Sequence, residues 1–149
     1  MRLENGSDKG FNLAELLIVI ACVAVLITIC LPNFYNIRQT WILWNGARQV
    51  ESSLQWGRMR AITSNTPVLF EVREDGREFA WVDPETGQSF ENTVRYTGND
   101  VSIVSSPKTP LRFYPRGNAV PAGTYKIEGK AGSYSVIVTP GGRIRFQKN

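Results

Sequence analysis

Residues 9–31 of the chain read KGFNLAELLIVIACVAVLITICL, and this apolar run is long enough to cross a membrane as a helix. From Leu13 to Leu31 the only polar side chains are Glu15 and Thr28. About 20 helical residues at about 1.5 Å each cover the hydrocarbon core of a bilayer. A charge at that depth costs about 2.5–3.5 kcal/mol on insertion scales, so Glu15 needs a functional explanation. The stretch therefore predicts a membrane helix with one carboxylate in its first turn.

The junction before this run resembles the class III leader of type IV pilins and pseudopilins. In that family a prepilin peptidase cuts between a glycine and a phenylalanine and methylates the new N-terminus, and a glutamate four residues further on serves filament assembly. Gly10, Phe11 and Glu15 have this spacing, although Asn12 stands where the family usually has threonine. The resemblance implies cleavage after Gly10, N-methylation of Phe11, and pairing of Glu15 with a Phe11 amine inside a filament. The implied partners are the peptidase, the inner membrane and other pilins or pseudopilins.

Three other interpretations of the N-terminus fit less well. A secretory signal peptide would have small residues after its apolar stretch, whereas this one ends in Ile29-Cys30-Leu31-Pro32-Asn33. A lipoprotein anchored at Cys22 would turn polar soon after that cysteine, but the chain stays apolar to Leu31. An ordinary single-span anchor explains the hydrophobicity but not the junction at Gly10 and Phe11.

Size and composition limit the remaining chemistry. After a leader and a membrane helix, roughly 85–115 of the 149 residues remain, enough for one soluble domain. The chain has no histidine, and its two cysteines, Cys22 and Cys30, lie about 12 Å apart along the apolar helix, too far for an intrachain disulfide. Neither a nucleophile motif nor a phosphate-binding glycine loop is present. We therefore expect no cofactor, no metal and no enzyme.

The rest of the chain predicts one long helix followed by strands. Pro32 should end the lipid-embedded part and kink the helix. Beyond it, small and apolar residues recur at helical spacing, which predicts one buried face: Leu43, Ala47, Val50, Leu54, Gly57 and Ala61. The segment 64–67 should close the helix. Turn signals then separate the predicted strands 68–73, 78–83, 101–104, 111–114, 123–127, 134–139 and 143–147, with a hairpin turn at 74–77.

This pattern predicts an α+β fold, in which a long N-terminal hydrophobic and amphipathic helix packs on a C-terminal antiparallel β-rich, sandwich-like domain. The expected divisions are a leader at 1–10, a transmembrane and assembly helix at 11–31, an amphipathic helix at 32–65 and a globular β domain at 66–149. The arginine-rich helix end LQWGRMRAITSNTPV (54–68) and the closing GGRIRF (141–146) resemble the GspH/FimT group of minor pilins and pseudopilins.

Charge is divided unevenly along the chain. Residues 11–100 carry seven arginines and ten acidic residues, whereas residues 101–149 carry eight basic residues and one acid, Glu128. Such a division points to an anionic partner for the C-terminal third. A basic surface that serves only solubility is the plain alternative.

On two of the predicted strands, the alternation of side chains would place arginines on one face and apolar residues on the other. Side chains two residues apart share a face of a strand, so Arg143 and Arg145 should oppose Ile144 and Phe146. In the same way Arg112, Tyr114 and Arg116 should oppose Leu111 and Phe113, and a joined face would suit phosphates and base stacking. Several members of the FimT branch are DNA receptors in natural transformation and use a Gly-Arg-x-Arg strand. The resemblance thus makes Arg143 and Arg145 candidate DNA contacts, with Gly142 shaping the turn, although arginines on an edge strand also prevent aggregation.

Acidic side chains crowd the predicted hairpin at 71–85, but no Asp-x-Asp-x-Asp-Gly loop for calcium appears, so we interpret them as a solvated surface.

Taken together, the resemblances predict a structural subunit of a type II secretion pseudopilus or a type IV pilus, near its tip and processed by a prepilin peptidase. Before assembly it would be a single-pass inner-membrane protein with a periplasmic globular domain. The alternative is a DNA-binding minor pilin that acts as a DNA receptor in natural transformation. Secreted cargo is a further partner that the basic third could contact.

Overall fold

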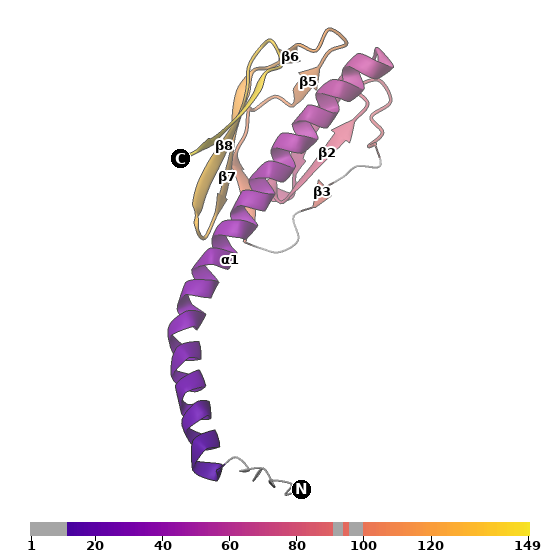
Figure 1. Ribbon diagram of the computed structural model, residues 1–149. Helices are drawn as coiled ribbons and strands as arrows, with labels where there is room; N and C mark the ends of the chain where they lie inside the picture. The colour runs from indigo at the N-terminus through magenta and orange to yellow at the C-terminus, as the bar shows by residue number, and fades with distance from the viewer. Residues whose placement is uncertain (1–11, 91–93, 96–99) are drawn as a thin grey trace, which may run out of the picture. The chain divides into compact units, whose positions relative to one another are not determined.

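The computed structural model describes residues 12–90, 94–95 and 100–149, and the chain divides into two units, Met1–Asn36 and Ile37–Asn149. Helix α1 (Leu13–Ser64) begins in the first unit and ends in the second (Figure 1). All nine strands found in the described residues belong to the second unit.

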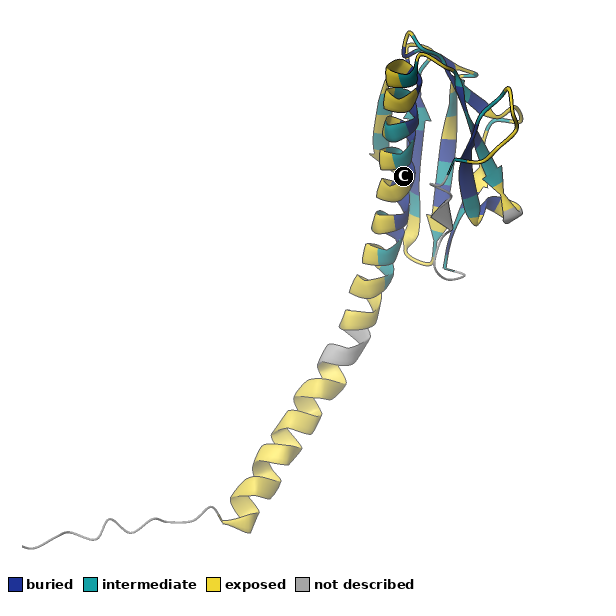
Figure 2. Cartoon of the chain, turned by 90° about the vertical axis from the view of Figure 1, so that its right-hand side faces the viewer, coloured by how far each residue is buried: buried dark blue, intermediate teal, exposed yellow. Residues whose placement is uncertain are grey.

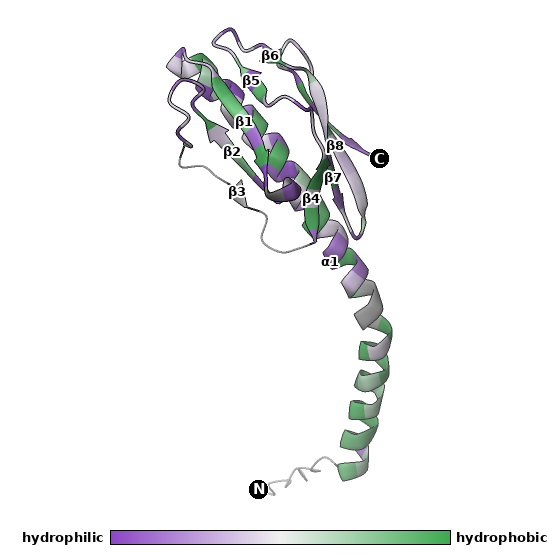
Figure 3. Ribbon diagram, turned by 180° about the vertical axis from the view of Figure 1, so that it is seen from behind, coloured by the Kyte–Doolittle hydropathy of each residue, from purple (hydrophilic) through white to green (hydrophobic). Residues whose placement is uncertain are grey.

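In the first unit, the described residues of α1 are exposed, and most of them are apolar (Figures 2 and 3). Its first turn is capped by Asn12, whose Oδ1 accepts a hydrogen bond from the backbone N–H of Ala14 at 3.3 Å. The Thr28 hydroxyl donates to the carbonyl of Ala24 at 2.8 Å, so this polar side chain is satisfied within the helix itself.

In the second unit, α1 buries one face and exposes the other (Figure 2). The predicted stripe is confirmed, because its members are all buried: Leu43, Ala47, Val50, Leu54, Gly57 and Ala61. The helix ends as expected after Ser64, whose hydroxyl donates to the carbonyl of Arg60 at 2.7 Å. Asn65 follows with a φ of 52°, a left-handed conformation common just after a helix end.

The strands form two antiparallel sheets (Figure 1). The first has the order β3-β2-β1-β5-β6 and consists of β3 (Val94–Arg95), β2 (Glu78–Val82), β1 (Val68–Arg73), β5 (Leu111–Phe113) and β6 (Ala119–Val120). The second has the order β4-β7-β8-β9 and consists of β4 (Val101–Ser105), β7 (Gly123–Gly129), β8 (Gly132–Val138) and β9 (Ile144–Lys148). Each pair of neighbouring strands within these sheets runs antiparallel.

The helix and the two sheets share one core. Phe70 of β1 meets Tyr125 of β7 edge to face, with ring centroids 5.4 Å apart, which joins the sheets. Trp81 of β2 lies 5.0 Å from the Phe70 ring, and its indole N–H donates to the Ser53 hydroxyl of α1 at 2.8 Å. The predicted α+β fold, a long helix on antiparallel sheets, is therefore confirmed.

Differences from the predicted strands have local causes. The strand expected at 78–83 ends at Val82, because the Asp83 carboxylate accepts the backbone N–H of Glu85 at 2.8 Å and begins a turn. The hairpin turn at 74–77 is confirmed as a short 3-10 turn, η1 (Glu74–Gly76), in which Asp75 and Gly76 have φ values of 52° and 85°. Strands β3 and β6 were not predicted, because two residues are too few to show alternation.

Candidate functional site

Glu15 lies in the first turn of α1. Its side chain is exposed, as are those of its apolar neighbours Leu13, Leu16 and Leu17. A carboxylate in a first turn is favoured by the helix dipole, but here it stands on an otherwise apolar surface. Gly10 and Phe11 lie outside the described residues, so leader cleavage, methylation and the pairing of Glu15 with an amine remain predictions.

No single helix of the described residues has both the length and the hydropathy of a membrane span. The segments Leu13–Ile29 and Phe34–Ser64 meet these criteria together, as a bent pair judged by length and composition. Pro32 falls between the two segments, and the kink expected there remains a prediction.

On β5 the predicted alternation holds over three residues. Leu111 and Phe113 are fully buried, whereas Arg112 between them is half-buried. Beyond the strand, the carbonyl of Tyr114 accepts the N–H of Gly117 at 2.8 Å, so the chain turns. Arg116 is therefore exposed in a turn instead of continuing the face of the strand.

On β9 the arginines are exposed and the apolar residues are partly covered. Ile144 and Phe146 are half-buried, and the Phe146 ring stacks on Tyr134 with centroids 4.9 Å apart. Arg145 and Arg143 are both exposed, as predicted. Arg143 precedes the strand in a turn, where its carbonyl accepts the backbone N–H of Thr139 at 3.0 Å.

The two arginine-bearing strands lie in different sheets, and the turns next to them are in contact. The N–H of Ala119 donates to the carbonyl of Pro140 at 2.9 Å. Gly142 lies so close to Gly117 that a β-carbon on it would collide with the Gly117 carbonyl oxygen. Arg116 and Arg143 each adjoin this contact in sequence, so the structure brings these two positions together. Arg112 and Arg145 lie within separate sheets, so strand pairing does not join the faces that carry them.

Sequence reasoning did not single out Arg58, which the structure places at the same contact. Its Nε donates to the carbonyl of Gly117 at 3.1 Å, joining α1 to the turn after β5. The available signal was its place beside Gly57 of the buried stripe, within the arginine-rich helix end. Its partner lies 59 residues away in sequence, so no local pattern could identify it.

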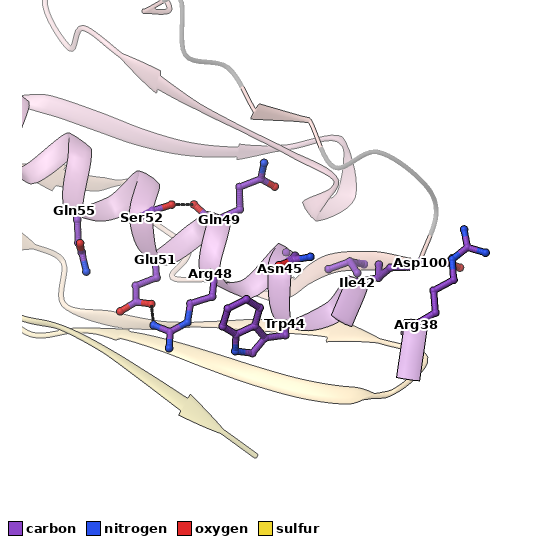
Figure 4. A pocket seen from close by; sticks show the side chains of 12 residues that line it. Arg38, Ile42, Trp44, Asn45, Arg48, Gln49, Glu51, Ser52, Gln55 and Asp100 are labelled. Carbon is purple, nitrogen blue, oxygen red and sulfur yellow. Dashed lines mark hydrogen bonds and ion pairs between the residues drawn. The ribbon is translucent and has the colours of Figure 1, made fainter. Parts of the chain in front are cut away.

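A groove of about 850 Å³ follows α1 between Arg38 and Gln55 and is bordered by Asp100 and Val101 (Figure 4). Both apolar and polar side chains line the groove, and they include an ion pair between Arg48 and Glu51 at 2.7 Å. No group of three or more metal-binding side chains occurs among the described residues. In the acidic hairpin, Glu71 pairs with Arg73 at 2.8 Å on the surface.

Comparisons with known proteins agree with this architecture. The family model of the type II transport protein GspH matches residues 46–142. The minor pseudopilin EpsH from the type 2 secretion system of Vibrio cholerae superimposes with a TM-score of 0.59 at 16% identity, over 71% of this chain and 96% of EpsH. The type IV minor pilin FimU of Pseudomonas aeruginosa gives a TM-score of 0.60 at 17% identity, over 70% of this chain and 87% of FimU. At these identities the superpositions establish the fold. No curated protein sequence gives a significant match.

Proposed function

Because the chain belongs to the family of the type II transport protein GspH, we propose that it is made as a prepilin-like precursor and assembles through its N-terminal helix. It is a structural subunit of the minor pseudopilin or minor pilin kind. In the proposed pathway a prepilin peptidase cleaves after Gly10 and methylates Phe11. Before assembly the protein resides in the inner membrane with its second unit in the periplasm. It then enters a filament at low copy number near the tip.

Glu15 on an apolar helix surface is the observation that carries this proposal. Apolar side chains are exposed on every side of Leu13–Ile29, so this segment needs an apolar environment. A lone charge in such an environment is costly, whereas a paired charge is tolerated. The amine released at Phe11 by cleavage is the matching partner, since it becomes available only in the mature protein.

The assembly proposal is tested by replacing Glu15 with leucine in the cells that make the filament. We expect Glu15→Leu to leave the amount of membrane-bound protein unchanged and to reduce its recovery with isolated filaments or pseudopili by about tenfold or more, the effect of losing one strong charge pair. Thr28→Val is the matched control, because it changes the other polar side chain of the run and removes only an internal hydrogen bond. Equal recovery of Glu15→Leu and the parent protein would exclude this role for Glu15.

Processing is tested independently by mass spectrometry of the membrane-extracted protein. We expect an N-terminus at Phe11 carrying one methyl group, and an uncut precursor when Gly10 is replaced by valine. A mature N-terminus elsewhere would contradict the leader assignment.

DNA binding is a second proposed function, favoured by the turns that bring Arg116 and Arg143 together. The positive charge of residues 101–149 adds long-range attraction for a polyanion. Arg145, Arg112 and Tyr114 are the further contacts that this proposal assigns. Acidic secreted cargo would suit the same surface. The salt dependence of the measured binding separates strong charge contacts from incidental ones.

The DNA proposal is tested with the full-length mature protein in a nonionic detergent, titrated with double-stranded DNA at two salt concentrations. We expect affinity to fall steeply with salt, and the Arg143→Ala/Arg145→Ala variant to lose most of the binding. A salt-independent signal, or binding that survives in the double variant, would rule out this interface.

A further inference from the structure

A small notch lies where the end of α1 passes the start of β9. It has a volume of about 320 Å³ and is lined by Gln55, Arg58, Met59, Arg143 and Ile144. We propose that this notch binds one phosphate group of a nucleic-acid backbone between the guanidinium groups of Arg58 and Arg143. This proposal rests on the second proposed function and adds a defined site with a helix arginine to it.

Among the described residues that line the notch, two are arginines and none carries a carboxylate. In the described part of the chain, neither Arg58 nor Arg143 forms an ion pair. Other surface arginines are neutralised locally, as Arg48 is by Glu51 at 2.7 Å and Arg73 by Glu71 at 2.8 Å. Two unneutralised guanidinium groups in one hollow repel each other, and an anion between them converts that repulsion into attraction.

Arg58 is held in position before any ligand arrives. Its Nε donates to the Gly117 carbonyl at 3.1 Å, and its side chain is half-buried against the turn that contains Gly117. Gly142 closes the other side, since a β-carbon there would lie 3.0 Å from Nε of Arg58. An arginine has five N–H donors, so one bond to Gly117 leaves four for a ligand. A guanidinium already ordered in this way loses less conformational entropy when it binds an anion.

The remaining lining favours a phosphate group carried by a larger molecule. Met59 and Ile144 provide an apolar wall, which suits the sugar attached to a phosphodiester, and the Gln55 amide provides a further donor. The exposed Arg145 follows on β9, and Arg116 adjoins Gly117 in the facing turn. A backbone phosphate in the notch would therefore have neighbouring phosphates near further positive charges, as a nucleic acid requires and a single free ion does not.

The test compares Arg58→Gln with Arg60→Gln in the full-length mature protein in nonionic detergent. Arg60 lies two residues further along the same helix, where its guanidinium covers the Phe90 ring at 5.6 Å instead of lining the notch. The probe is a short double-stranded DNA, titrated at several salt concentrations. We expect Arg58→Gln to weaken binding about tenfold and to lower the slope of log affinity against log salt by about 1, because one phosphate contact is lost. Arg60→Gln should leave that slope unchanged.

Arg58→Lys is the control for correct folding, because it keeps the positive charge but not the forked geometry of the guanidinium group. We expect it to unfold at nearly the parent temperature and to restore only part of the affinity. Equal losses for Arg58→Gln and Arg60→Gln would overturn the notch while leaving DNA binding through Arg143 and Arg145 intact.

Two further probes separate the notch from the DNA proposal. Inorganic pyrophosphate that binds in an Arg58-dependent way, in a protein that does not bind DNA, would support the phosphate site and refute the DNA function. Polyglutamate that binds more tightly than DNA with the same Arg58 dependence would overturn the assignment to phosphate and indicate an acidic protein partner. No binding of any of these anions would overturn the notch altogether.

Discussion

Gly57 of α1 lies directly against the indole ring of Trp81 on β2, so closely that a β-carbon on Gly57 would collide with the six-membered ring. Trp81 is fully buried, and its indole N–H is fixed by the Ser53 hydroxyl one turn earlier on the same helix, at 2.8 Å. The helix therefore approaches the first sheet at a point where only a residue without a side chain fits.

Gly57→Ala should destabilise the protein despite the better helix propensity of alanine. Alanine gains up to about 1 kcal/mol over glycine in a helix interior. Overpacking a filled core costs about 1–3 kcal/mol, and the rigid, hydrogen-bonded Trp81 ring has little room to move. We expect a net loss of about 1 kcal/mol or more, measured by thermal unfolding followed in the near-ultraviolet circular dichroism of the tryptophans.

Gly141→Ala is the control for this change, because a β-carbon there would meet nothing within 4 Å. Its unfolding temperature should equal that of the parent protein within error. A Gly57→Ala protein as stable as the parent would show that the helix and the sheet can separate without cost at this point.

Arg48 of α1 contacts the last strand, β9, and so links it to the helix. Its guanidinium lies 4.4 Å from the centroid of the Phe146 ring on β9 and 5.3 Å from that of Trp44, and it also pairs with Glu51 at 2.7 Å. Cation–π contacts are worth about 0.5–2 kcal/mol, and the exposed ion pair adds less than about 1 kcal/mol. We expect Arg48→Ala to lower stability by about 1–2 kcal/mol.

Glu51→Gln separates the two contributions of Arg48, because it removes the ion pair and leaves the ring contacts. It should cost much less stability than Arg48→Ala. Hydrogen exchange of β9 amides should accelerate in Arg48→Ala and remain near the parent rate in Glu51→Gln. Equal effects of the two variants would assign the role of Arg48 to the ion pair instead.

The helix core was predictable from sequence because burial follows a local period. Leu43, Val50 and Leu54 recur at helical spacing, and a single buried face imposes that spacing on the chain. Alternation likewise predicted that Arg112 would point away from Leu111 and Phe113. Both patterns are repeated within one continuous segment of the chain, so they are visible without knowledge of the fold.

The arrangement of the arginines was not predictable in the same way. Whether β5 and β9 share a sheet depends on strand pairing over long sequence distances, and alternation within each strand carries no information about it. The bond from Arg58 to Gly117 is non-local for the same reason. Sequence therefore predicted the exposure of Arg143 and Arg145, whereas the structure was needed to find which arginines lie near one another.

Tyr125 should make the protein sensitive to alkaline pH. Burial raises the pKa of the Tyr125 phenol above its ordinary value, because the ionised form is not solvated in the core. A raised pKa in the folded state means that the stabilising effect is complete below the unfolded pKa of about 10 and is lost as the pH rises above it. We expect the unfolding temperature of the parent protein to fall more steeply above pH 10 than that of Tyr125→Phe. Parallel curves for the two proteins would contradict this effect.

Gly142 should control the basic surface without contributing any charge to it. Its φ is 73°, and a β-carbon on it would collide with the carbonyl of Gly117. The left-handed conformation costs an alanine about 1–2 kcal/mol, and the collision must displace one of the two turns as well. We expect Gly142→Ala to lower stability by about 2 kcal/mol or more and to weaken anion binding although every arginine is retained.

Gly132→Ala separates backbone strain from the contact between the turns. Gly132 also has a positive φ, 127°, but a β-carbon there would meet nothing within 4 Å. It should therefore lose stability through strain alone and keep the affinity of the parent for DNA or pyrophosphate. If Gly142→Ala kept that affinity too, the position of Arg143 would not depend on the Gly117 contact, and Arg58 and Arg143 would have to act as independent surface charges.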